Sequence, residues 1–562
     1  MKKIWLDSYP PGVPPEIDAR AFTSLKELLE RTCLRYQHRA AFCNMGVPLT
    51  YGELDRLSRD FAAYLQKTCG LGKAERVAIM LPNLLQYPVV LFGALRAGLT
   101  VVNVNPLFTA SELEHQLADS GAAAIVVLEN FAQVLEQALP GTRVRHVVTT
   151  QVGDLFPAVK RVLVNFAVKR VKRMVPPWRI PGATGFRDAL AQGARCSLED
   201  ANLGPADVAF LQYTGGTTGR AKGAVLTHAN MVANVEQVAA WSRVVLQEGA
   251  ETVITALPLY HVFALTANLL VFLKLGGTDV LITNPRDIAG FVAELKKTRF
   301  TVIVGVNTLY AALLSARGFD EVCAASRGVL KLAVAGGMSV QRAVGERWQE
   351  ATGVPLVEGY GLTEASPVVC GNPFDAKGFS GKLGLPLPST EVAILDEHGN
   401  ELPLGEIGEI CARGPQVMQG YWNSPEETAA VLTPEGWLRT GDLGWMDERG
   451  RVEFSERRKD VIVVSGFKAY PAEIEDVAML HPGVRDAGAA GVPDARSGEA
   501  VALFVVKKDP ALTAEALLEH CARHLTGYKL PKRIEFREQL PKTPIGKVLR
   551  RELREQALRS RA

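Results

Sequence analysis

The sequence has few cysteines, and none of them are closely spaced. Its eight cysteines are scattered along 562 residues, and no Cys-x-x-Cys pair occurs. Zinc sites and thioredoxin-type redox sites depend on such pairs, so neither is expected. Widely spaced, reduced thiols are typical of cytoplasmic enzymes. We therefore expect a cytoplasmic location.

The sequence also lacks a long hydrophobic run and an excess of either charge. The longest apolar stretch, Val262–Leu273, is much shorter than the ~20 residues that cross a bilayer. The N-terminal residues MKKIWLDSYPPG contain no hydrophobic signal core. The chain has 63 basic and 60 acidic residues, too even a balance for a dedicated nucleic-acid-binding protein. We expect a soluble or peripheral protein with no nucleic-acid partner.

Two catalytic fingerprints are missing as well. No Gly-x-Ser-x-Gly elbow occurs, which argues against nucleophilic hydrolase chemistry. The glycine-rich loop of the chain does not have the Gly-x-Gly-x-x-Gly spacing of dinucleotide-binding proteins.

Helices alternate with buried strands over the first 370 residues. Apolar runs at Arg76–Met80, Thr100–Val104 and Ala123–Val127 predict strands. Thr50 with Glu53, and Thr109 with Glu112, have the spacing of capping boxes and predict helix starts. This alternation indicates an α/β fold whose sheets are doubly wound, with helices on both faces.

The pattern of residues in the sequence changes near Gly381 and again after Arg457. Short β-branched runs broken by Gly and Pro predict a small β-subdomain with a turn at His398–Asn400. The last 100 residues predict a separate α+β domain behind the charged linker SERRKD. The predicted units are a large N-terminal domain of mixed sheets at 1–456 with its β-subdomain at about 381–456, a hinge linker at 457–461 and a mobile C-terminal domain at 462–562.

The most informative segment is Tyr213–Gly223, with the sequence YTGGTTGRAKG. It follows a predicted strand at Val208–Leu211. Its glycines let backbone N–H groups approach phosphate oxygens, its threonines add hydroxyl donors and Lys222 adds positive charge. The spacing is not that of a Walker A loop. The alternative is a flexible Gly/Thr turn without a ligand.

This segment resembles the phosphate loop of the adenylate-forming superfamily, which contains acyl-CoA synthetases, luciferases and peptide-synthetase adenylation domains. Further motifs follow in the order of that family. They are Glu358–Glu364 (EGYGLTE), Trp437–Asp442 (WLRTGD), Arg457–Glu475 and Pro541–Lys547 (PKTPIGK). Segments such as LPLYHVFALTANLL and LTGYKLPK resemble bacterial long-chain fatty-acid–CoA ligases in particular, and the resemblance runs nearly end to end.

The resemblance implies a reaction in two steps. A fatty-acid carboxylate attacks the α-phosphate of ATP to give acyl-AMP and pyrophosphate, and the thiol of CoA then displaces AMP. Mg²⁺ with ATP, and CoA, are the implied cofactor and co-substrates. Because the first step brings an anion against a polyanion, the site must supply positive charge.

The resemblance also assigns roles to residues. Thr214 and Glu364 would hold Mg²⁺, which takes oxygen ligands. Tyr360 would stack on adenine, and Asp442 would accept both ribose hydroxyls. Lys547 would stabilise charge at the α-phosphate, with His261 and Thr363 as further catalytic candidates. The other candidates for ATP or AMP binding are Tyr213, Gly215, Gly216, Thr217, Thr218, Gly219, Lys222, Gly336, Gly337, Glu358, Gly359, Gly361 and Arg457.

By the same resemblance, the C-terminal domain swings between the two half-reactions. Lys459 occupies the hinge position, and Gly466 would let the pantetheine of CoA pass close to the backbone. Alternatives without a role in catalysis or binding stay open. In these, Gly466 is a hairpin glycine, His261 is a core histidine and Lys547 is a solvated lysine in a basic tail. Ala221 and Glu456 depart from the residues commonest in the family, but neither change removes a charged ligand.

Residues 155–187 form a basic segment with eight Lys or Arg side chains and no acidic one. Val159, Val162, Leu163 and Phe166 fall on one helical face, a pattern typical of a helix at a membrane interface. We expect peripheral contact with the anionic inner face of the cytoplasmic membrane. The alternative is an insertion that packs on its own domain and exposes a basic face.

Two other functions remain open at this point. One is an acyl-adenylating ligase for medium-chain or aryl acids, and the other is a catalytically silent lipid-binding protein at the membrane. The sequence also leaves the oligomeric state open, including a homodimer.

Overall fold

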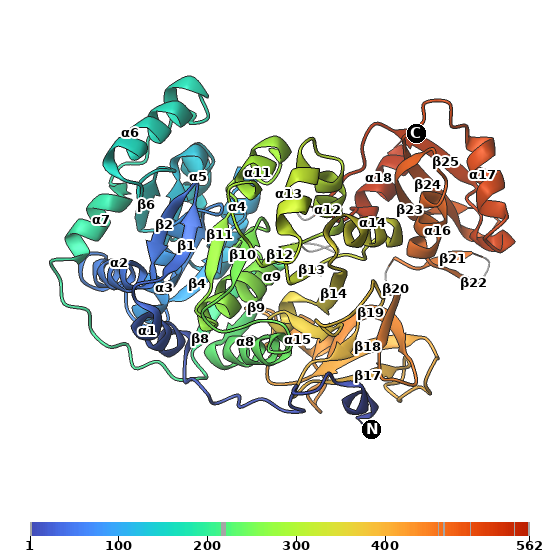
Figure 1. Ribbon diagram of the computed structural model, residues 1–562, viewed down its shortest axis with the longest axis horizontal. Coiled ribbons are helices and arrows are strands. Elements are labelled where there is room, and N and C mark those ends of the chain that lie inside the picture. Colours follow the sequence, from blue (N-terminus) through green and yellow to red (C-terminus); the bar gives the residue numbers. More distant parts are fainter. Residues whose placement is uncertain are drawn as a thin grey trace.

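The computed structural model describes residues 3–214, 221–458, 460–464, 467–494, 496–543 and 546–559, and for Arg457 and Lys468 it describes the backbone only. In this part of the chain the strands form four sheets, of seven, nine, four and five strands. Figure 1 shows the two large sheets in the N-terminal region, the four-stranded sheet below them and the five-stranded sheet at the C-terminal end.

The seven-stranded sheet has the predicted phosphate loop between its last two strands, β8 and β9. Those two strands are antiparallel, whereas the other pairs are parallel. Val77 and Ile79 of β3 pack into a core on one face, while Ala78 and Met80 pack on the other. In sheet order the strands are β7 (Thr184–Gly185), β6 (His146–Thr150), β5 (Ala124–Leu128), β3 (Arg76–Met80), β4 (Thr100–Asn103), β8 (Val208–Thr214) and β9 (Lys222–Thr227).

The nine-stranded sheet is parallel at its centre and antiparallel at both edges. It shares one hydrophobic core with the seven-stranded sheet, so the two sheets fold as one unit. In sheet order its strands are β16 (Leu385–Pro386), β15 (Val368–Gly371), β14 (Leu356–Gly361), β13 (Leu332–Ala335), β12 (Val302–Gly305), β10 (Thr252–Thr255), β11 (Thr278–Leu281), β1 (Ala40–Asn44) and β2 (Val47–Thr50).

Helices cover both faces of these sheets, as the sequence predicted. Leu113 of α4 and Leu135 of α5 cover one face of the seven-stranded sheet, and Phe61 of α2 and Phe92 of α3 belong to the core on the other. The α-helices of this region are α1 (Leu25–Tyr36), α2 (Tyr51–Ala63), α3 (Gln86–Arg96), α4 (Ala110–Ser120), α5 (Ala132–Ala138), α6 (Ala158–Phe166), α7 (Phe186–Gly193), α8 (His228–Ser242), α9 (Val262–Ala264), α10 (Val271–Lys274), α11 (Ile288–Leu295), α12 (Asn307–Leu314), α13 (Phe319–Ser326) and α14 (Arg342–Thr352).

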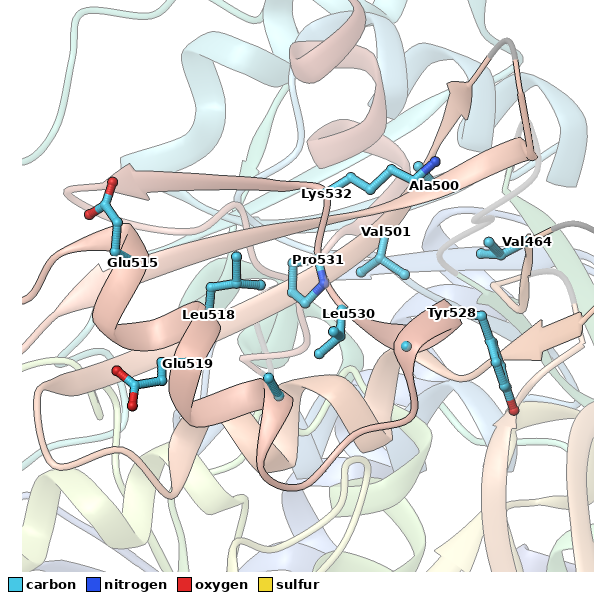
Figure 2. Close-up of a pocket in the computed structure, with 12 residues that line it drawn as sticks. Val464, Ala500, Val501, Glu515, Leu518, Glu519, Tyr528, Leu530, Pro531 and Lys532 are labelled. Carbon is cyan, nitrogen blue, oxygen red and sulfur yellow. The ribbon is translucent and has the colours of Figure 1, made fainter.

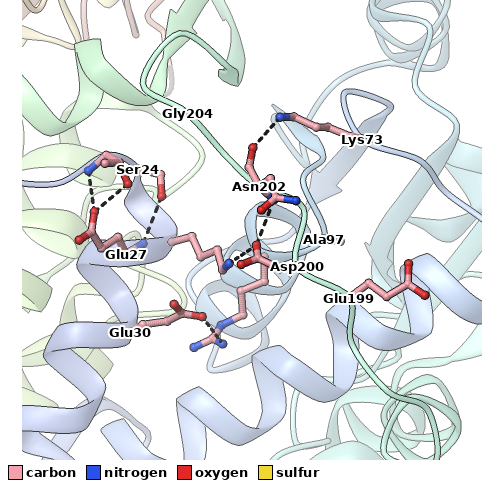
Figure 3. Close-up of polar contacts among 12 residues, drawn as sticks. Ser24, Glu27, Glu30, Lys73, Ala97, Glu199, Asp200, Asn202 and Gly204 are labelled. Carbon is pink, nitrogen blue, oxygen red and sulfur yellow. Dashed lines mark hydrogen bonds and ion pairs between the residues drawn. The ribbon is translucent and has the colours of Figure 1, made fainter.

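The segment 194–207 connects α7 to β8 without helix or strand. Side chains from elsewhere in the fold fix its path, as Figure 3 shows. The ammonium of Lys26 on α1 lies 2.6 Å from Asp200, and that of Lys73 donates to the carbonyl of Asn202 at 2.9 Å. These contacts fix where β8 begins, and β8 leads directly into the predicted phosphate loop.

The four-stranded sheet is antiparallel and forms the β-subdomain that the sequence predicted. It consists of β17 (Glu391–Leu395), β18 (Gly408–Arg413), β19 (Leu438–Met446) and β20 (Val452–Arg457). The predicted turn at His398–Asn400 is present, because the Asp396 N–H donates to the carbonyl of Asn400 at 2.9 Å. Helix α15 (Pro425–Val431) lies between β18 and β19 in the chain.

The C-terminal domain is a small α+β unit around a five-stranded sheet. Ile474 of α16 and Leu517 of α17 pack on one face of that sheet, and Leu553 of α18 packs on the other. The strands are β21 (Ile462–Val464), β22 (Phe467–Ala469), β23 (Val484–Asp494), β24 (Gly498–Lys507) and β25 (Arg533–Arg537), and the helices are α16 (Pro471–Met479), α17 (Ala514–Ala522) and α18 (Arg550–Arg559).

The predicted fold class and its local signals are confirmed. Both capping boxes form, with Thr50 and Thr109 accepting from the N–H of Glu53 and Glu112. The large domain of mixed sheets and the smaller α+β domain are both present. The exact boundaries at 456, 457–461 and 462 stay a prediction.

Helix α6 carries the predicted apolar face and turns it outward, at the upper left of Figure 1. Val159, Val162, Leu163 and Phe166 are between 59% and 75% exposed. Val164, on the other side of the helix, packs against the core. The amphipathic character of the segment is therefore real, and its apolar side does not cover its own domain. Among the described helices, none has the length and hydrophobicity needed to cross a membrane.

Candidate active site

Eight of the predicted site residues lie where two neighbouring strands of the nine-stranded sheet end. Strand β13 ends at Ala335, directly before Gly336 and Gly337. Strand β14 contains Glu358, Gly359, Tyr360 and Gly361, and the short helix η7 (Thr363–Ala365) follows it with Thr363 and Glu364. Ligands of open α/β sheets bind at the carboxyl ends of strands, so the chain brings these residues to a suitable edge.

Tyr360 and Asp442 meet across the boundary between two sheets. The Tyr360 hydroxyl donates to the Asp442 carboxylate at 2.7 Å. Asp442 lies on β19 and pairs with Arg457 of β20. Burial, with the Asp442 charge as a second cause, raises the pKa of Tyr360, so its hydroxyl stays protonated and acts as a donor. The predicted adenine and ribose contacts are thus adjacent.

Glu364 and Lys222 each have a partner that sequence analysis did not predict. The Tyr421 hydroxyl donates to Glu364 at 2.6 Å. The Lys222 ammonium pairs with Glu427 of α15 at 2.5 Å and lies 5.4 Å from the centre of the Tyr421 ring. Tyr421 therefore contacts both the predicted metal ligand and the predicted phosphate-loop cation.

Gly336 sits in a position with no room for a side chain. A Cβ there would lie 2.9 Å from the Phe263 ring and 3.2 Å from the carbonyl oxygen of Gly359. The next residue, Gly337, has a φ of +76°, in the left-handed region that favours glycine. Both glycines are needed for this turn after β13.

His261 is held as a neutral imidazole at the start of α9. Its Nδ1 accepts from the Phe263 N–H at 3.3 Å and caps the helix. Burial lowers the pKa of His261 to about 4. Because Nδ1 is an acceptor, the proton of the ring is on Nε2, and only that nitrogen can donate to a substrate.

Glu358 is the other titratable group at the end of β14. One carboxylate oxygen accepts from the Val340 N–H at 3.3 Å, and the other is buried with no hydrogen-bond partner among the described residues. Burial raises the pKa of Glu358 to about 7. The group can be a hydrogen-bond donor or an acceptor near neutral pH.

The lysine motif of the C-terminal domain reaches the N-terminal region. The Thr543 N–H donates to the carbonyl of Lys547 at 2.7 Å, and the Lys547 N–H returns a bond to the Thr543 hydroxyl at 3.1 Å. Gly546 lies so close to Thr308 of α12 that a Cβ would meet the Thr308 hydroxyl at 2.5 Å. The turn that carries Lys547 is therefore seated on the large domain.

The structure does not bring every predicted residue to this edge. The Tyr213 hydroxyl donates to Asp119. The Tyr213 ring packs against the core under α4 and α5, on the face of the seven-stranded sheet that carries Ala78 and Met80. Thr214 is the last residue of β8 and pairs with Lys222. Several predicted residues lie outside the described part of the chain, namely Gly215, Gly216, Thr217, Thr218, Gly219, Lys459, Gly466 and the side chain of Arg457.

A separate pocket of about 500 Å³ lies within the C-terminal domain (Figure 2). Val501, Leu518, Leu530 and Pro531 make it largely apolar, and Glu515 lies at its edge. None of the predicted site residues that the structure describes lines it.

The chain matches two models of protein families. The model for AMP-binding enzymes matches residues 29–422, and the model for the C-terminal domain of AMP-binding enzymes matches residues 473–547. The chain belongs to the AMP-binding enzyme family.

Known proteins are similar to this family member over its whole length. A long-chain-fatty-acid–CoA ligase of Salmonella typhimurium is 56% identical, with 99% of each chain covered. One of Escherichia coli O6:H1 is 55% identical, again with 99% of each covered. The crystal structure of ATP-bound MatB from Rhodopseudomonas palustris matches with a TM-score of 0.79 and 28% identity, covering 95% of this chain and 99% of that one.

Tyr421 and Glu427 contact two predicted site residues, and sequence analysis did not predict either of them. They lie in the segment GYWNSPEET, which has no residue spacing that indicates a ligand. The Tyr421 N–H donates to the Thr428 hydroxyl at 2.8 Å, and the Tyr421 backbone forms an isolated β-bridge with Ala224 of β9. Only the packing of this segment on β9 brings the two side chains to Glu364 and Lys222.

Tyr421→Phe should weaken Mg²⁺-dependent ATP binding. The change removes the donor that orients Glu364, and loss of such an outer partner typically costs ~10–100-fold in metal affinity or activity. Calorimetric titration with ATP at several Mg²⁺ concentrations measures the effect. Tyr310→Phe is the matched control, because that buried hydroxyl donates to the backbone of Val334 instead. Equal affinities in the two variants would show that Tyr421 does not position Glu364.

Proposed function

We propose that this family member activates long-chain fatty acids to acyl-CoA through an acyl-AMP intermediate, releasing pyrophosphate and AMP. The observation that carries the proposal is the full-length identity of 56% to a long-chain-fatty-acid–CoA ligase, which extends over both domains. The substrates are a fatty acid, ATP and CoA.

The edge of the nine-stranded sheet holds the nucleotide. The Tyr360 ring stacks on adenine, and its bond to Asp442 fixes the ring plane. Asp442 accepts the ribose hydroxyls, which suits a carboxylate with two oxygens. Lys222 exchanges Glu427 for phosphate oxygens, since both partners are anions that its ammonium can pair with.

Mg²⁺ fits this site as an ion carried by ATP. Among the described residues, no cluster of three or more His, Cys, Asp or Glu side chains offers a complete metal site. Glu364 supplies one oriented carboxylate, and Thr214 at the end of β8 supplies a hydroxyl. One or two protein oxygens together with phosphates and water are the usual ligands of this ion. When bound, it screens the charge of the phosphates.

Lys547 and His261 serve the first step. The ammonium of Lys547 stabilises the negative charge that develops at the α-phosphate as the carboxylate attacks. Neutral His261 donates from Nε2 to an oxygen of the acid or phosphate, while Thr363 supplies a further hydroxyl. For the second step the C-terminal domain turns at Lys459 in the linker 457–461, which brings Gly466 to the path of the CoA thiol.

The acid specificity tests the proposed function directly. The protein with ATP, Mg²⁺ and CoA should convert palmitate or oleate to acyl-CoA and release one pyrophosphate per product. Benzoate should give little pyrophosphate, because the chain is 56% identical to a long-chain-fatty-acid–CoA ligase over its full length. Chromatography of the products across chain lengths is the measurement. A preference for aryl or medium-chain acids would support the rival ligase, and no acyl-CoA from any acid would support a silent lipid-binding protein.

Lys547→Ala should abolish most adenylation and leave the CoA step nearly intact. Loss of one charge-stabilising donor costs ~10²–10³-fold, whereas acyl-AMP supplied from outside no longer needs that charge. ATP–pyrophosphate exchange and thioester formation from acyl-AMP measure the two steps separately. Lys542→Ala is the matched control, because Lys542 belongs to the same motif but pairs with Asp486 at 2.5 Å. Equal losses in both steps would refute the role given to Lys547.

Helix α6 contacts an anionic membrane and brings the enzyme to its insoluble substrate. Phe166 and Leu163 are exposed, and Arg170, Lys172 and Arg173 follow them on the surface. Apolar side chains beside a basic cluster favour the boundary between head groups and acyl chains. Each charge contributes ~1 kcal/mol at most, so the contact is reversible and peripheral.

Arg170→Gln, Lys172→Gln and Arg173→Gln together should reduce binding to anionic liposomes without changing turnover of octanoate. The set leaves Lys169 in place, because Lys169 pairs with Glu129 at 3.3 Å within the fold. Binding of the parent should fall as ionic strength rises, since salt screens surface charges. Cosedimentation measures both effects. A triple variant that binds as well as the parent would remove α6 from any role at the membrane.

A further inference from the structure

Arg550 joins three carboxylates around the interdomain linker. It is the first residue of α18, and its side chain is only 14% exposed. Its guanidinium bonds Glu475 of α16 through two nitrogens at 2.8 and 3.0 Å. It also donates to Glu456 of β20 at 3.1 Å and to Asp460 at 3.2 Å. We call Arg550 with Glu456, Asp460 and Glu475 the linker clamp.

The linker clamp holds both sides of the proposed hinge. Glu456 lies on β20 of the β-subdomain, whereas Asp460 and Glu475 follow the hinge position in the chain. Glu456 is fully buried, and its second oxygen accepts from the Ala472 N–H at 2.7 Å. Amides in the first turn of a helix have no partner within the helix. The Ala472 amide of α16 is therefore satisfied from across the linker.

The linker clamp also lies close to the predicted catalytic lysine. Lys547 precedes Arg550 by three residues, and the Leu549 N–H donates to the carbonyl of Pro541 at 2.9 Å, which closes the intervening turn. The same turn rests on Thr308 of α12 through Gly546. An orientation that keeps Arg550 on Glu456 thus keeps Lys547 at the large domain.

We propose that the linker clamp locks the domain orientation used for adenylation, and that it separates at Glu456 before CoA attacks. The inference rests on the proposed two-step reaction. Arg550 is a positioning residue in this scheme, since it acts through the placement of Lys547. In this scheme, the Arg550–Glu456 ion pair is formed during adenylation and broken during the CoA step.

The charges explain why removal of Arg550 would open the lock. Without its guanidinium, Glu456 on one side of the hinge faces Asp460 and Glu475 on the other. Asp476 adds a fourth carboxyl group, and burial raises its pKa to about 6, with Glu456 as a further cause. A buried carboxylate that loses its guanidinium partner is costly, and like charges repel. Turning the domain away from β20 relieves both effects.

Hydrogen exchange at the Ala472 amide tests the linker clamp without relying on activity. Arg550→Gln leaves the direct partner of that amide, Glu456, unchanged. If the lock opens, the amide separates from Glu456 and exchanges at least ~10-fold faster, as expected for loss of a hydrogen bond to a charged group. Glu473→Gln is the matched control, since it breaks an ion pair of the same helix, to Lys529 at 2.7 Å, within the C-terminal domain.

The half-reactions provide the second measurement. Arg550→Gln should slow ATP–pyrophosphate exchange ~10-fold relative to thioester formation from supplied acyl-AMP, and Glu473→Gln should not change that ratio. If Arg550→Gln does not fold, Glu456→Gln keeps the shape of the side chain and should shift the ratio in the same direction.

The outcomes separate the lock from the reaction. Unchanged Ala472 exchange in Arg550→Gln overturns the linker clamp, and so does an equal loss of both half-reactions. If the Ala472 amide exchanges faster in Arg550→Gln but the parent protein makes no acyl-AMP, the linker clamp is supported and the proposed function is rejected.

Discussion

The bond between Tyr360 and Asp442 connects the edge of the nine-stranded sheet to the β-subdomain, and the rest of the site is arranged around it. Tyr360 lies near the end of β14, where that strand pairs antiparallel with β15, and Asp442 lies on an antiparallel strand of another sheet. The bond brings together a ring from one sheet and a carboxylate from another. The β-subdomain docks through a hydrophobic core that it shares with the large sheets, to which Val392, Ile410 and Leu438 contribute, and the Tyr360–Asp442 bond adds a polar contact between the two sheets.

The cations around this edge are already paired with carboxylates. Lys222 pairs with Glu427, and Arg550 pairs with Glu456, Asp460 and Glu475. An enzyme that binds polyanions needs positive charge, but unpaired buried cations are expensive. Each cation is held on a carboxylate, which avoids that cost, and in the proposed mechanism phosphate or a domain movement replaces that carboxylate. Tyr421 and Arg550 act alike in the proposed mechanism. Tyr421 orients the Glu364 carboxylate, and Arg550 holds the carboxylates of Glu456, Asp460 and Glu475.

Two apolar features lie outside the nucleotide site and have different characters. The outward face of α6 exposes apolar side chains beside basic residues, a combination that suits a lipid surface. The pocket of the C-terminal domain is concave, with Glu515 at its edge.

The sequence by itself determined the fold class, the two domains, both capping boxes and the amphipathic face of α6. Each of these depends on the spacing of residues that are close together in the sequence, which does not depend on tertiary packing. It also predicted Tyr360, Asp442, Glu364 and Lys547 as site residues, through motifs that resemble a known family. The tertiary structure alone decided that Tyr360 bonds Asp442, and that Tyr213 turns to Asp119 instead.

The tertiary structure also revealed Tyr421, Glu427 and the linker clamp. Their partners are far away in the sequence: Tyr421 is 57 residues from Glu364, and Arg550 is 94 residues from Glu456. Periodicity and motif spacing describe neighbours along the chain, so they contain no information on such pairs. These contacts exist because separate strands, helices and domains pack together. Burial in that packing strengthens the electrostatic interactions between the charged groups.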